Sequence, residues 1–380
     1  MNQKIKEYVD ANREEMFAML RELCLIPAPS HFEDARAAWC KSWLEANGAT
    51  GVYIDEAKNV VFPLNCEGSR EITVIAAHTD TVFPDTEPMP YVDDGECIRC
   101  PGVTDDTANV VVLLLCAKYM IENGIRPKDG ILFVCNSCEE GLGNLKGCRQ
   151  IFKDFAGRVK QFISYDGYFS ELSNSCVGSH RYEIEVTTEG GHSWSKFGRK
   201  NAIAELSRMI SRIYEIEVPH VGDSRTTYNV GTVEGGTSIN TIAQKAKMFC
   251  EYRSDNEECL SIMEGYFKKI FSEAESDGVH VSVNLVGERP CMGKVDLVKM
   301  AEMTETISKI VGDVTGVFPQ ASAMSTDCNI PCSLGVPGVM IGVCEGGGAH
   351  TREEWMKKDN FHLGLEVGIQ IALTLGEVEK

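Results

Sequence analysis

The sequence has no hydrophobic run long enough to cross a membrane and no excess of positive charge. Its longest uninterrupted apolar segment, Val110 to Ala117, is much shorter than the roughly 20 residues of a transmembrane helix. Lysine and arginine number 37 against 56 aspartates and glutamates, so the net charge is −19. This charge argues against nucleic acid or an anionic membrane as a partner. It does not argue against a small substrate, because the field at one site can differ from the net charge.

Residues 1–25 carry charges throughout, have the apolar spacing of an amphipathic helix and contain no signal-peptide apolar core. The 16 cysteines are scattered and mostly lie inside apolar runs, as buried thiols do. We therefore expect no disulfide framework and a cytoplasmic location. Two C-x-x-C pairs, Cys97 with Cys100 and Cys135 with Cys138, leave a structural zinc site open. The second pair lies on a predicted strand that runs into acidic residues, which is a poor place for such a site.

No internal repeat or low-complexity segment appears in the 380 residues, and this length predicts two domains. Between residues 176 and 289 the apolar periodicity spells β-α-β-β-α-β, the split ferredoxin-like pattern of a separate domain. Its elements are expected at 179–188, 201–215, 227–233, 245–253, 257–275 and 279–286. We therefore expect an α/β domain formed by residues 1–175 and 290–380, interrupted by this second domain.

Three apolar segments of the first domain are typical of buried strands, and each is followed by a histidine or by carboxylates. They are 71–77 before His78 and Asp80, 131–136 before Glu139 and Glu140, and 162–165 before Asp166. Open α/β sheets keep their sites at the carboxyl ends of their strands. His78 could bind a metal while Asp80 orients its ring, although a strand-end histidine with an ion-paired aspartate fits the same pattern.

Two pairs of adjacent carboxylates have both a structural and a chemical interpretation. Asp105 and Asp106 precede an apolar helix, where they could cap free amides or where one of them could bridge metal ions from a rigid loop. Glu139 and Glu140 could form a solvated acidic turn. Adjacent glutamates repel each other unless a cation separates their roles, in which case one binds the metal and its neighbour takes a proton from bound water.

Glycine-rich turns surround the remaining candidates. His192 follows two glycines, Asn240 ends a turn at 235–240, and Arg253 ends a predicted strand. Each of these features is more typical of a turn or a surface than of a site. Three glycines also precede His350, and no Lys-Ser/Thr follows them to hold a phosphate. They favour instead a close approach of the backbone to a site that His350 enters.

Taken together, the motifs resemble the co-catalytic dizinc peptidase and aminoacylase family, which includes peptidase T, carboxypeptidase G, acetylornithine deacetylase and succinyl-diaminopimelate desuccinylase. The matching segments are His78-Thr79-Asp80, Val103-Thr104-Asp105-Asp106, Glu139-Glu140, Asp166, Gly191-His192, Gly236-Thr237-Ser238-Ile239-Asn240 and Gly348-Ala349-His350. They follow the family's order and cover essentially the whole chain. Residues 325–329 and Glu354-Trp355 are most similar to the peptidase-T-like branch. The chain departs from many relatives at Thr107, where they have lysine, and near Asn109, where they have glycine.

The resemblance implies a dinuclear zinc site, with cobalt or manganese able to replace zinc. One zinc would bind His78 and Asp166, the other would bind Glu140 and His350, and Asp105 would bridge them, with a cis Asp105–Asp106 peptide bond. Asp80 would orient His78, and Glu139 would be the general base that activates the bridging water. All five ligands fall outside residues 176–289.

The resemblance also implies a fold and an assembly. A zinc-peptidase-like catalytic domain would have a mixed central sheet flanked by helices, and the interrupting domain would act as a lid that dimerises. His192 of one subunit would then reach the oxyanion of the partner's substrate, while Asn240 and Arg253 match positions that bind the substrate's backbone or carboxylate. We therefore expect a homodimer.

The expected function is that of a dizinc aminopeptidase or di/tripeptidase acting on a small peptide. An N-acyl amino acid deacylase with the same machinery is the alternative. In this family an aspartate at the position of Asp166 accompanies aminopeptidases and dipeptidases more often, whereas glutamate accompanies deacylases and carboxypeptidases. A non-catalytic metal-binding scaffold is a third hypothesis. Glu139 argues against it, because a scaffold has no use for a spare base.

Overall fold

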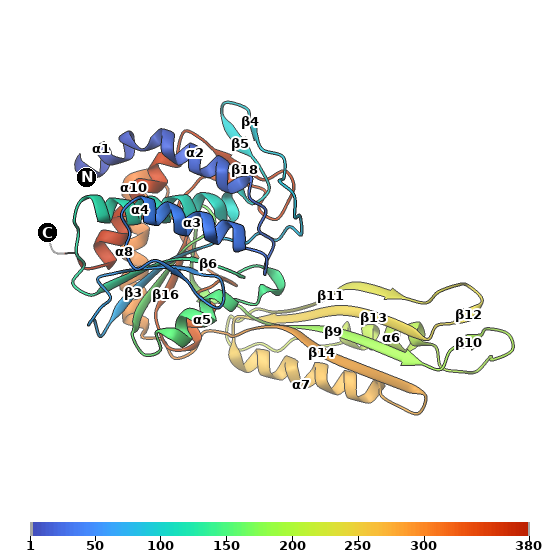
Figure 1. The fold of residues 1–380 in the computed structure, drawn as a ribbon. Coiled ribbons are helices and arrows are strands. Elements are labelled where there is room, and N and C mark those ends of the chain that lie inside the picture. The colour runs from blue at the N-terminus through green and yellow to red at the C-terminus, as the bar shows by residue number, and fades with distance from the viewer. Residues whose placement is uncertain (1–2, 379–380) are drawn as a thin grey trace. The chain divides into compact units, whose positions relative to one another are not determined.

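The computed structural model describes residues 3–378, and the chain divides into two compact units (Figure 1). The first unit comprises Met1–Ser175 and Gly293–Lys380, and the second comprises Cys176–Met292. Within the described residues no helix is long and apolar enough to cross a membrane.

The first unit is built on an eight-stranded mixed sheet with the order β1-β2-β6-β3-β7-β16-β8-β15. Its strands are β1 (Tyr53–Ile54), β2 (Val60–Leu64), β3 (Ile72–His78), β6 (Gly130–Asn136), β7 (Val159–Tyr165), β8 (Glu171–Cys176), β15 (Gln320–Met324) and β16 (Gly338–Ile341). Strand β3 runs parallel to β6 and β7, and β16 runs parallel to β7, whereas β2 and β8 pair antiparallel with their neighbours. The predicted α/β class with a mixed sheet is therefore confirmed.

Continuous apolar sequence explains the centre of this sheet. Every residue of β3 and β6 is buried, as expected for parallel strands that are covered by helices on both faces. The covering helices are α1 (Gln3–Ala11), α2 (Arg13–Cys24), α3 (Asp34–Ala46), α4 (Ala108–Glu122), α5 (Lys146–Asp154), α8 (Leu297–Thr315), α9 (Asn329–Ser333) and α10 (Phe361–Leu375) (Figure 1). Helix α4 is apolar around its whole circumference because it packs between β3 and the helices α2, α3 and α10.

The second unit has a four-stranded antiparallel sheet with the order β11-β13-β9-β14. Its elements follow the chain as β9 (Gly178–Thr188), α6 (Ala202–Ile213), β11 (Thr226–Gly235), β13 (Lys245–Ser254), α7 (Glu257–Ala274) and β14 (Val279–Arg289). This is the strand order of a βαββαβ ferredoxin-like unit. Side chains of α6 and α7 form one hydrophobic core with the sheet, as Met209 and Phe267 do with Met248. Two short strands, β10 (Gly191–His192) and β12 (Thr241–Ile242), pair separately.

The prediction for the N-terminal helix was wrong in detail, and two further segments have short elements of their own. The expected helix over residues 1–25 is broken at Asn12, whose side-chain amide donates to the Tyr8 carbonyl oxygen at 2.7 Å and so competes with the helical hydrogen-bond pattern. Helix α9 begins within the polar segment 325–331. Segment 83–100 contains β4 (Val92–Asp93) and β5 (Cys97–Arg99), which join β17 (Gly346–Gly347) and β18 (Trp355–Lys357) in a small sheet with the order β17-β18-β5-β4.

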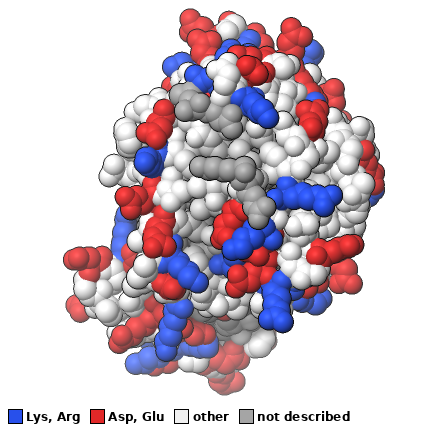
Figure 2. Space-filling view, turned by 90° about the vertical axis from the view of Figure 1, so that its left-hand side faces the viewer, with Lys and Arg blue, Asp and Glu red and all other residues white. Residues whose placement is uncertain are grey.

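Charged side chains of both signs are interspersed on the face of the molecule seen in Figure 2. Several charged side chains of the chain are paired, as Lys160 is with Asp129 and Glu377, both at 2.8 Å. Such exposed pairs contribute at most about 1 kcal/mol each to folding. The fold therefore depends chiefly on the apolar layers described above.

Candidate dinuclear metal site

The carboxyl ends of three adjacent parallel strands bring the predicted strand-end residues together. His78 ends β3, Glu139 and Glu140 follow β6, and Asp166 follows β7. Strand β3 lies between β6 and β7 in the sheet. Because parallel strands end at the same edge of a sheet, the three sets of side chains converge there.

Asp105 enters the same place from the turn Val103–Thr107, which leads into α4. Its Oδ1 lies 3.0 Å from Nε2 of His78, and its Oδ2 lies 3.0 Å from Nε2 of His350. One carboxylate thus links two imidazoles through its two oxygens. The Asp105–Asp106 peptide bond is cis, as the resemblance implied.

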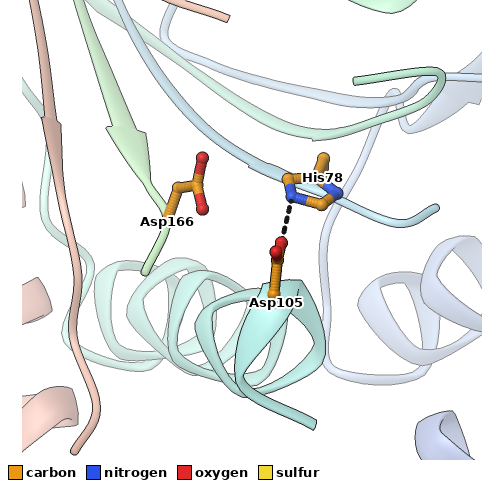
Figure 3. Close-up of side chains that lie close together, drawn as sticks. All are labelled: His78, Asp105 and Asp166. Carbon is orange, nitrogen blue, oxygen red and sulfur yellow. Dashed lines mark hydrogen bonds and ion pairs between the residues drawn. The ribbon is translucent and has the colours of Figure 1, made fainter. Parts of the chain in front are cut away.

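Two groups of three potential ligands share Asp105. His78, Asp105 and Asp166 form the first, and Asp105, Glu140 and His350 form the second; within each group the ligand atoms lie within 4.8 Å of one another. Figure 3 shows the three side chains of the first group pointing toward a common space from a strand end, a helix start and a neighbouring strand end. The predicted ligands therefore lie in the arrangement that two ions bridged by Asp105 would need.

The donor chemistry also fits metal ions. Imidazole nitrogens and carboxylate oxygens are the usual ligands of zinc outside cysteine-rich sites. Glu140 Oε1 is buried without a hydrogen-bond donor, and its closest charged neighbour is Nε2 of His350 at 3.2 Å. A buried carboxylate oxygen in this situation is costly unless a cation meets it.

The pKa values of the site reflect carboxylates that are crowded together in a buried space. Burial raises the pKa of Glu140 to about 8, with the charge of Asp105 acting in the same direction. Burial also raises the pKa of Asp166, which faces the charge of Asp105 as well. The carboxylate of Asp105 and the adjacent carboxylate of Glu140 raise the pKa of His350 to about 11. Carboxylates that crowd together in a buried site behave in this way, and bound divalent cations would relieve the repulsion.

Asp80 organises the loop of the two glutamates. Its Oδ1 accepts the amide of Glu139 at 2.9 Å, and its Oδ2 accepts the amide of Glu140 at 3.0 Å and the hydroxyl of Ser30 at 2.6 Å. The carboxylate lies 3.5 Å from Nδ1 of His78, while the backbone carbonyl of Asp80 accepts from the same nitrogen at 3.0 Å. This bond leaves Nε2 of His78 facing Asp105, which is the orientation that metal binding requires.

Glu139 lies beside the ligands. Its side chain is buried, and its carboxylate forms a third group with His78 and Glu140 in which the ligand atoms lie within 4.8 Å of one another. A carboxylate in this position can reach a water molecule held between the two ligand groups. Its geometry therefore suits a general base.

Sequence reasoning missed several buried residues that hold the ligand loops. The side-chain amide of Asn109 donates to the Thr104 carbonyl and the Gly167 carbonyl, while its oxygen accepts the Val343 amide at 2.9 Å. Buried Arg36 donates to the Thr79 carbonyl at 2.9 Å and to the Thr107 hydroxyl at 3.2 Å. The two departures from the family pattern, Thr107 and Asn109, thus make hydrogen bonds beside the site. No spacing in the sequence signals such contacts.

The candidates of the second unit are not all in one place. His192 and Asn240 lie on adjacent short strands or turns, where the amide of Ser193 donates to the Asn240 carbonyl at 2.9 Å. Arg253 lies near the far end of β13 and pairs with Glu251 at 2.8 Å. Since Lys245 begins that strand, about 26 Å of extended chain separates the two ends. The structure therefore brings His192 and Asn240 together but leaves Arg253 apart from them.

The C-x-x-C cysteines do not form a zinc site. Among the described residues, no group of potential metal ligands contains a cysteine, and all 16 cysteines are free thiols. Cys135 lies inside β6 and Cys97 in β5, in two different sheets.

Comparisons with known proteins agree on one family. The model of peptidase family M20/M25/M40 matches residues 74–374. The chain is 24% identical over 366 residues to a succinyl-diaminopimelate desuccinylase of Corynebacterium glutamicum, which covers 93% of this chain and 95% of the relative. Aminopeptidase PepT of Bacillus cereus has a similar structure, with a TM-score of 0.70 and 19% identity over 95% of this chain and 98% of that one. The YXEP protein of Bacillus subtilis, a dinuclear metal-binding peptidase, matches with a TM-score of 0.66 and 15% identity, covering 97% of this chain and 100% of that one.

Proposed function

Because the chain belongs to peptidase family M20/M25/M40, we propose that it hydrolyses an amide bond of a small peptide, as an aminopeptidase or a di/tripeptidase, with two zinc ions at the site described above. The observation that carries this proposal is the carboxylate of Asp105, which lies 3.0 Å from Nε2 of both His78 and His350. Because the carboxylate of Asp105 is shared by two groups of three potential ligands, five side chains would provide two metal positions. In this proposal Asp166 completes the first position and Glu140 the second.

The chain's own residues would divide the reaction among them. When two divalent cations are bound, they acidify water and polarise a carbonyl oxygen. Glu139 takes a proton from the attacking water and delivers it to the leaving amine. Asp80 holds the amides of Glu139 and Glu140, so that base and ligand keep different positions although they are adjacent in sequence.

His192 and Asn240 would act on the substrate. An imidazole can stabilise the oxyanion that develops when water attacks the amide carbon. His192 is exposed, and its Nδ1 accepts the nearby Trp194 amide at 3.2 Å, so Nε2 is the nitrogen that can face a substrate. We propose that it serves the site of a partner subunit, with Asn240 beside it and Arg253 binding a substrate carboxylate.

An N-acyl amino acid deacylase is the second candidate, and the desuccinylase relative that covers 93% of the chain favours it. The aspartate at position 166 favours the peptidase, following the family pattern stated above. Hydrolysis of a panel of di- and tripeptides, compared with N-acetyl and N-succinyl amino acids, separates the two. Turnover of the acylated amino acids alone would replace the peptidase proposal by the deacylase.

The adjacent glutamates provide the test of the mechanism. Glu139→Gln should keep about two metal ions per chain by elemental analysis and lose roughly 10²–10⁴-fold in turnover, which is the usual contribution of a general base. Glu140→Gln, the matched control one residue away, should instead lose metal. If the two variants behave the other way round, the two roles are exchanged. If the wild-type protein binds metal but hydrolyses no peptide or acylated amino acid, this result favours the non-catalytic metal-binding scaffold over an enzyme.

A further inference from the structure

A buried glutamate from the loop of His350 accepts hydrogen bonds from the loop of Asp105. Glu354 is fully buried and lies four residues after His350 in the sequence. Its Oε2 accepts the Gly102 amide at 2.6 Å. Its Oε1 accepts three donors, which are the Thr104 amide at 2.7 Å, the Thr104 hydroxyl at 2.6 Å and the Asp105 amide at 3.0 Å. Four donors of the Asp105 loop therefore converge on a single carboxylate.

The backbone around Glu354 ties the same two loops together. Strand β18 pairs with β5, with Trp355 opposite Arg99. The Cys100 amide then donates to the Glu354 carbonyl at 3.2 Å. The four side-chain bonds begin where this pairing ends, so they extend the connection from the small sheet up to Asp105 itself. The separation between the two ligands Asp105 and His350 consequently depends on Glu354.

The charge of Glu354 has no cationic partner among residues 3–378, since no ion pair joins it to a lysine, arginine or histidine in that range. Burial raises its pKa, and the charge of Asp105 adds to the effect, while its hydrogen bonds act in the opposite direction. A buried carboxylate without a counter-ion is costly. The four hydrogen bonds offset that cost only while the Asp105 loop keeps its present conformation. The conformation of the loop and the burial of the Glu354 carboxylate therefore depend on each other.

We propose that Glu354 is a positioning residue that holds the Asp105 carboxylate between His78 and His350, so that metal affinity depends on it. The inference rests on the dinuclear site proposed above. Residues that orient metal ligands through hydrogen bonds often change metal affinity or activity by roughly 10–100-fold when they are replaced. Glu354 would act on the one ligand that both metal positions share.

The test measures metal binding directly. In Glu354→Gln, one carboxylate oxygen becomes an amide group that donates, so at least one donor of the Asp105 loop loses its acceptor. We expect Zn²⁺ affinity, measured by competition with a chromophoric chelator, to fall roughly 10–100-fold. We also expect the visible absorption spectrum of the Co²⁺-substituted protein to change, because that spectrum reports the ligand geometry. Thr104→Val removes one of the four bonds and should produce a smaller change in the same direction.

Glu366→Gln is the matched control. Glu366 is a buried glutamate of α10 whose carboxylate accepts from Gln370 at 3.2 Å, and within residues 3–378 no hydrogen bond or ion pair joins it to a proposed ligand. It should leave the Zn²⁺ affinity and the Co²⁺ spectrum unchanged.

Different results separate the ways in which the inference could fail. If Glu354→Gln lowers the unfolding temperature but keeps the Zn²⁺ affinity and Co²⁺ spectrum of the wild type, Glu354 is only structural and the proposal is wrong. If Glu354→Gln does not fold, Thr104→Val decides, and wild-type metal binding in that variant overturns the proposal. If the wild-type protein itself binds neither metal, the dinuclear site is wrong and the inference falls with it.

Discussion

Asp80 belongs to neither of the two three-residue groups of potential ligands that share Asp105. Its carboxylate nevertheless accepts hydrogen bonds from the backbone amides of both Glu139 and Glu140. The Asp80 carbonyl also accepts from His78. A single buried side chain and its backbone thus orient one proposed ligand from β3 and fix the loop that follows β6. At the scale of residues, the site depends on such polar side chains as much as on the proposed ligands.

Replacing Asp80 should therefore damage both metal binding and turnover. In Asp80→Asn one carboxylate oxygen becomes a donor that faces a backbone amide, so one of the two glutamate amides loses its acceptor. We expect kcat/KM to fall roughly 10–100-fold, with weaker Zn²⁺ binding. Ser30→Ala is the control, because it removes the hydroxyl bonds to the Asp80 carboxylate at 2.6 Å and to the Glu140 carbonyl at 3.3 Å but keeps both amide bonds; it should cost about 1 kcal/mol of unfolding free energy. Equal effects of the two variants on kcat/KM would contradict this role of Asp80.

At the scale of elements, strand ends rather than whole strands carry the proposed chemistry. Strands β3, β6 and β7 each contribute a side chain at their carboxyl end, while the interiors of β3 and β6 are buried among apolar residues. The turn after β6 also departs from extended backbone, because Cys138 has φ 57. The Glu33 carboxylate holds that turn by accepting the Cys138 amide at 3.1 Å. The residue before Glu139 is thereby held in a left-handed backbone conformation.

In the second unit, strands β9 and β13 carry a cross-strand pair that predicts acid sensitivity. His180 lies opposite Tyr252, and its Nδ1 is 2.5 Å from the tyrosine hydroxyl. Burial lowers the pKa of His180, and nearby Lys268 acts in the same direction, whereas Glu288 and Glu264 act against it. The unfolded chain, with a histidine pKa of about 6.5, therefore binds a proton at a higher pH than the folded chain does.

The sign of the pH dependence follows from this difference. The stability that neutral His180 provides is fully present above about pH 6.5 and is lost as the pH falls through the lower pKa of the folded state. Protection factors of the β9 and β13 amides, in which exchange rates are corrected for the intrinsic pH dependence of exchange, should fall between pH 7.5 and 5 more strongly in the wild type than in His180→Gln, which cannot titrate at this position. Identical pH profiles for the two proteins would show that His180 does not carry the effect.

At the scale of the whole molecule, the second unit leaves two sheet edges open for assembly. Strands β11 and β14 form the edges of its sheet. Val233 of β11 and Val283 and Leu285 of β14 are exposed by 54%, 46% and 45%. Unpaired edges with apolar side chains favour pairing between chains, and most soluble homo-oligomers are two-fold symmetric. We therefore predict a homodimer through the second unit, which sedimentation analysis can detect.

Subunit mixing tests whether His192 acts in the partner's site. Glu139→Gln and His192→Ala are each expected to be inactive alone. After complete exchange of an equimolar mixture, about half of the two-fold dimers are heterodimers with one complete site each, so about a quarter of the sites should recover. The complete site uses Glu139 of the His192→Ala subunit and His192 of its partner. Verified exchange without recovery would exclude action between subunits.

The sequence by itself determined the strands and the residues at their ends. Buried parallel strands appear as continuous apolar runs, so β3, β6 and β7 could be recognised, and with them His78, Glu139, Glu140 and Asp166 at the edge where α/β sheets keep their sites. The βαββαβ order of the second unit could also be predicted from the sequence, because helices and strands have different periods of apolar residues. The family motifs then supplied roles for Asp105 and His350 that spacing alone left open.

Only the tertiary structure decided how those side chains are held. Strands β8 and β15 are short and polar, with no period that marks them, and they exist because the sheet provides partners. The bonds from Asp105 to Glu354 and from Asn109 to Val343 join residues 249 and 234 positions apart. A buried polar group must find a partner wherever the fold places one. These contacts could therefore not be predicted from the local sequence, because they depend on how distant loops pack.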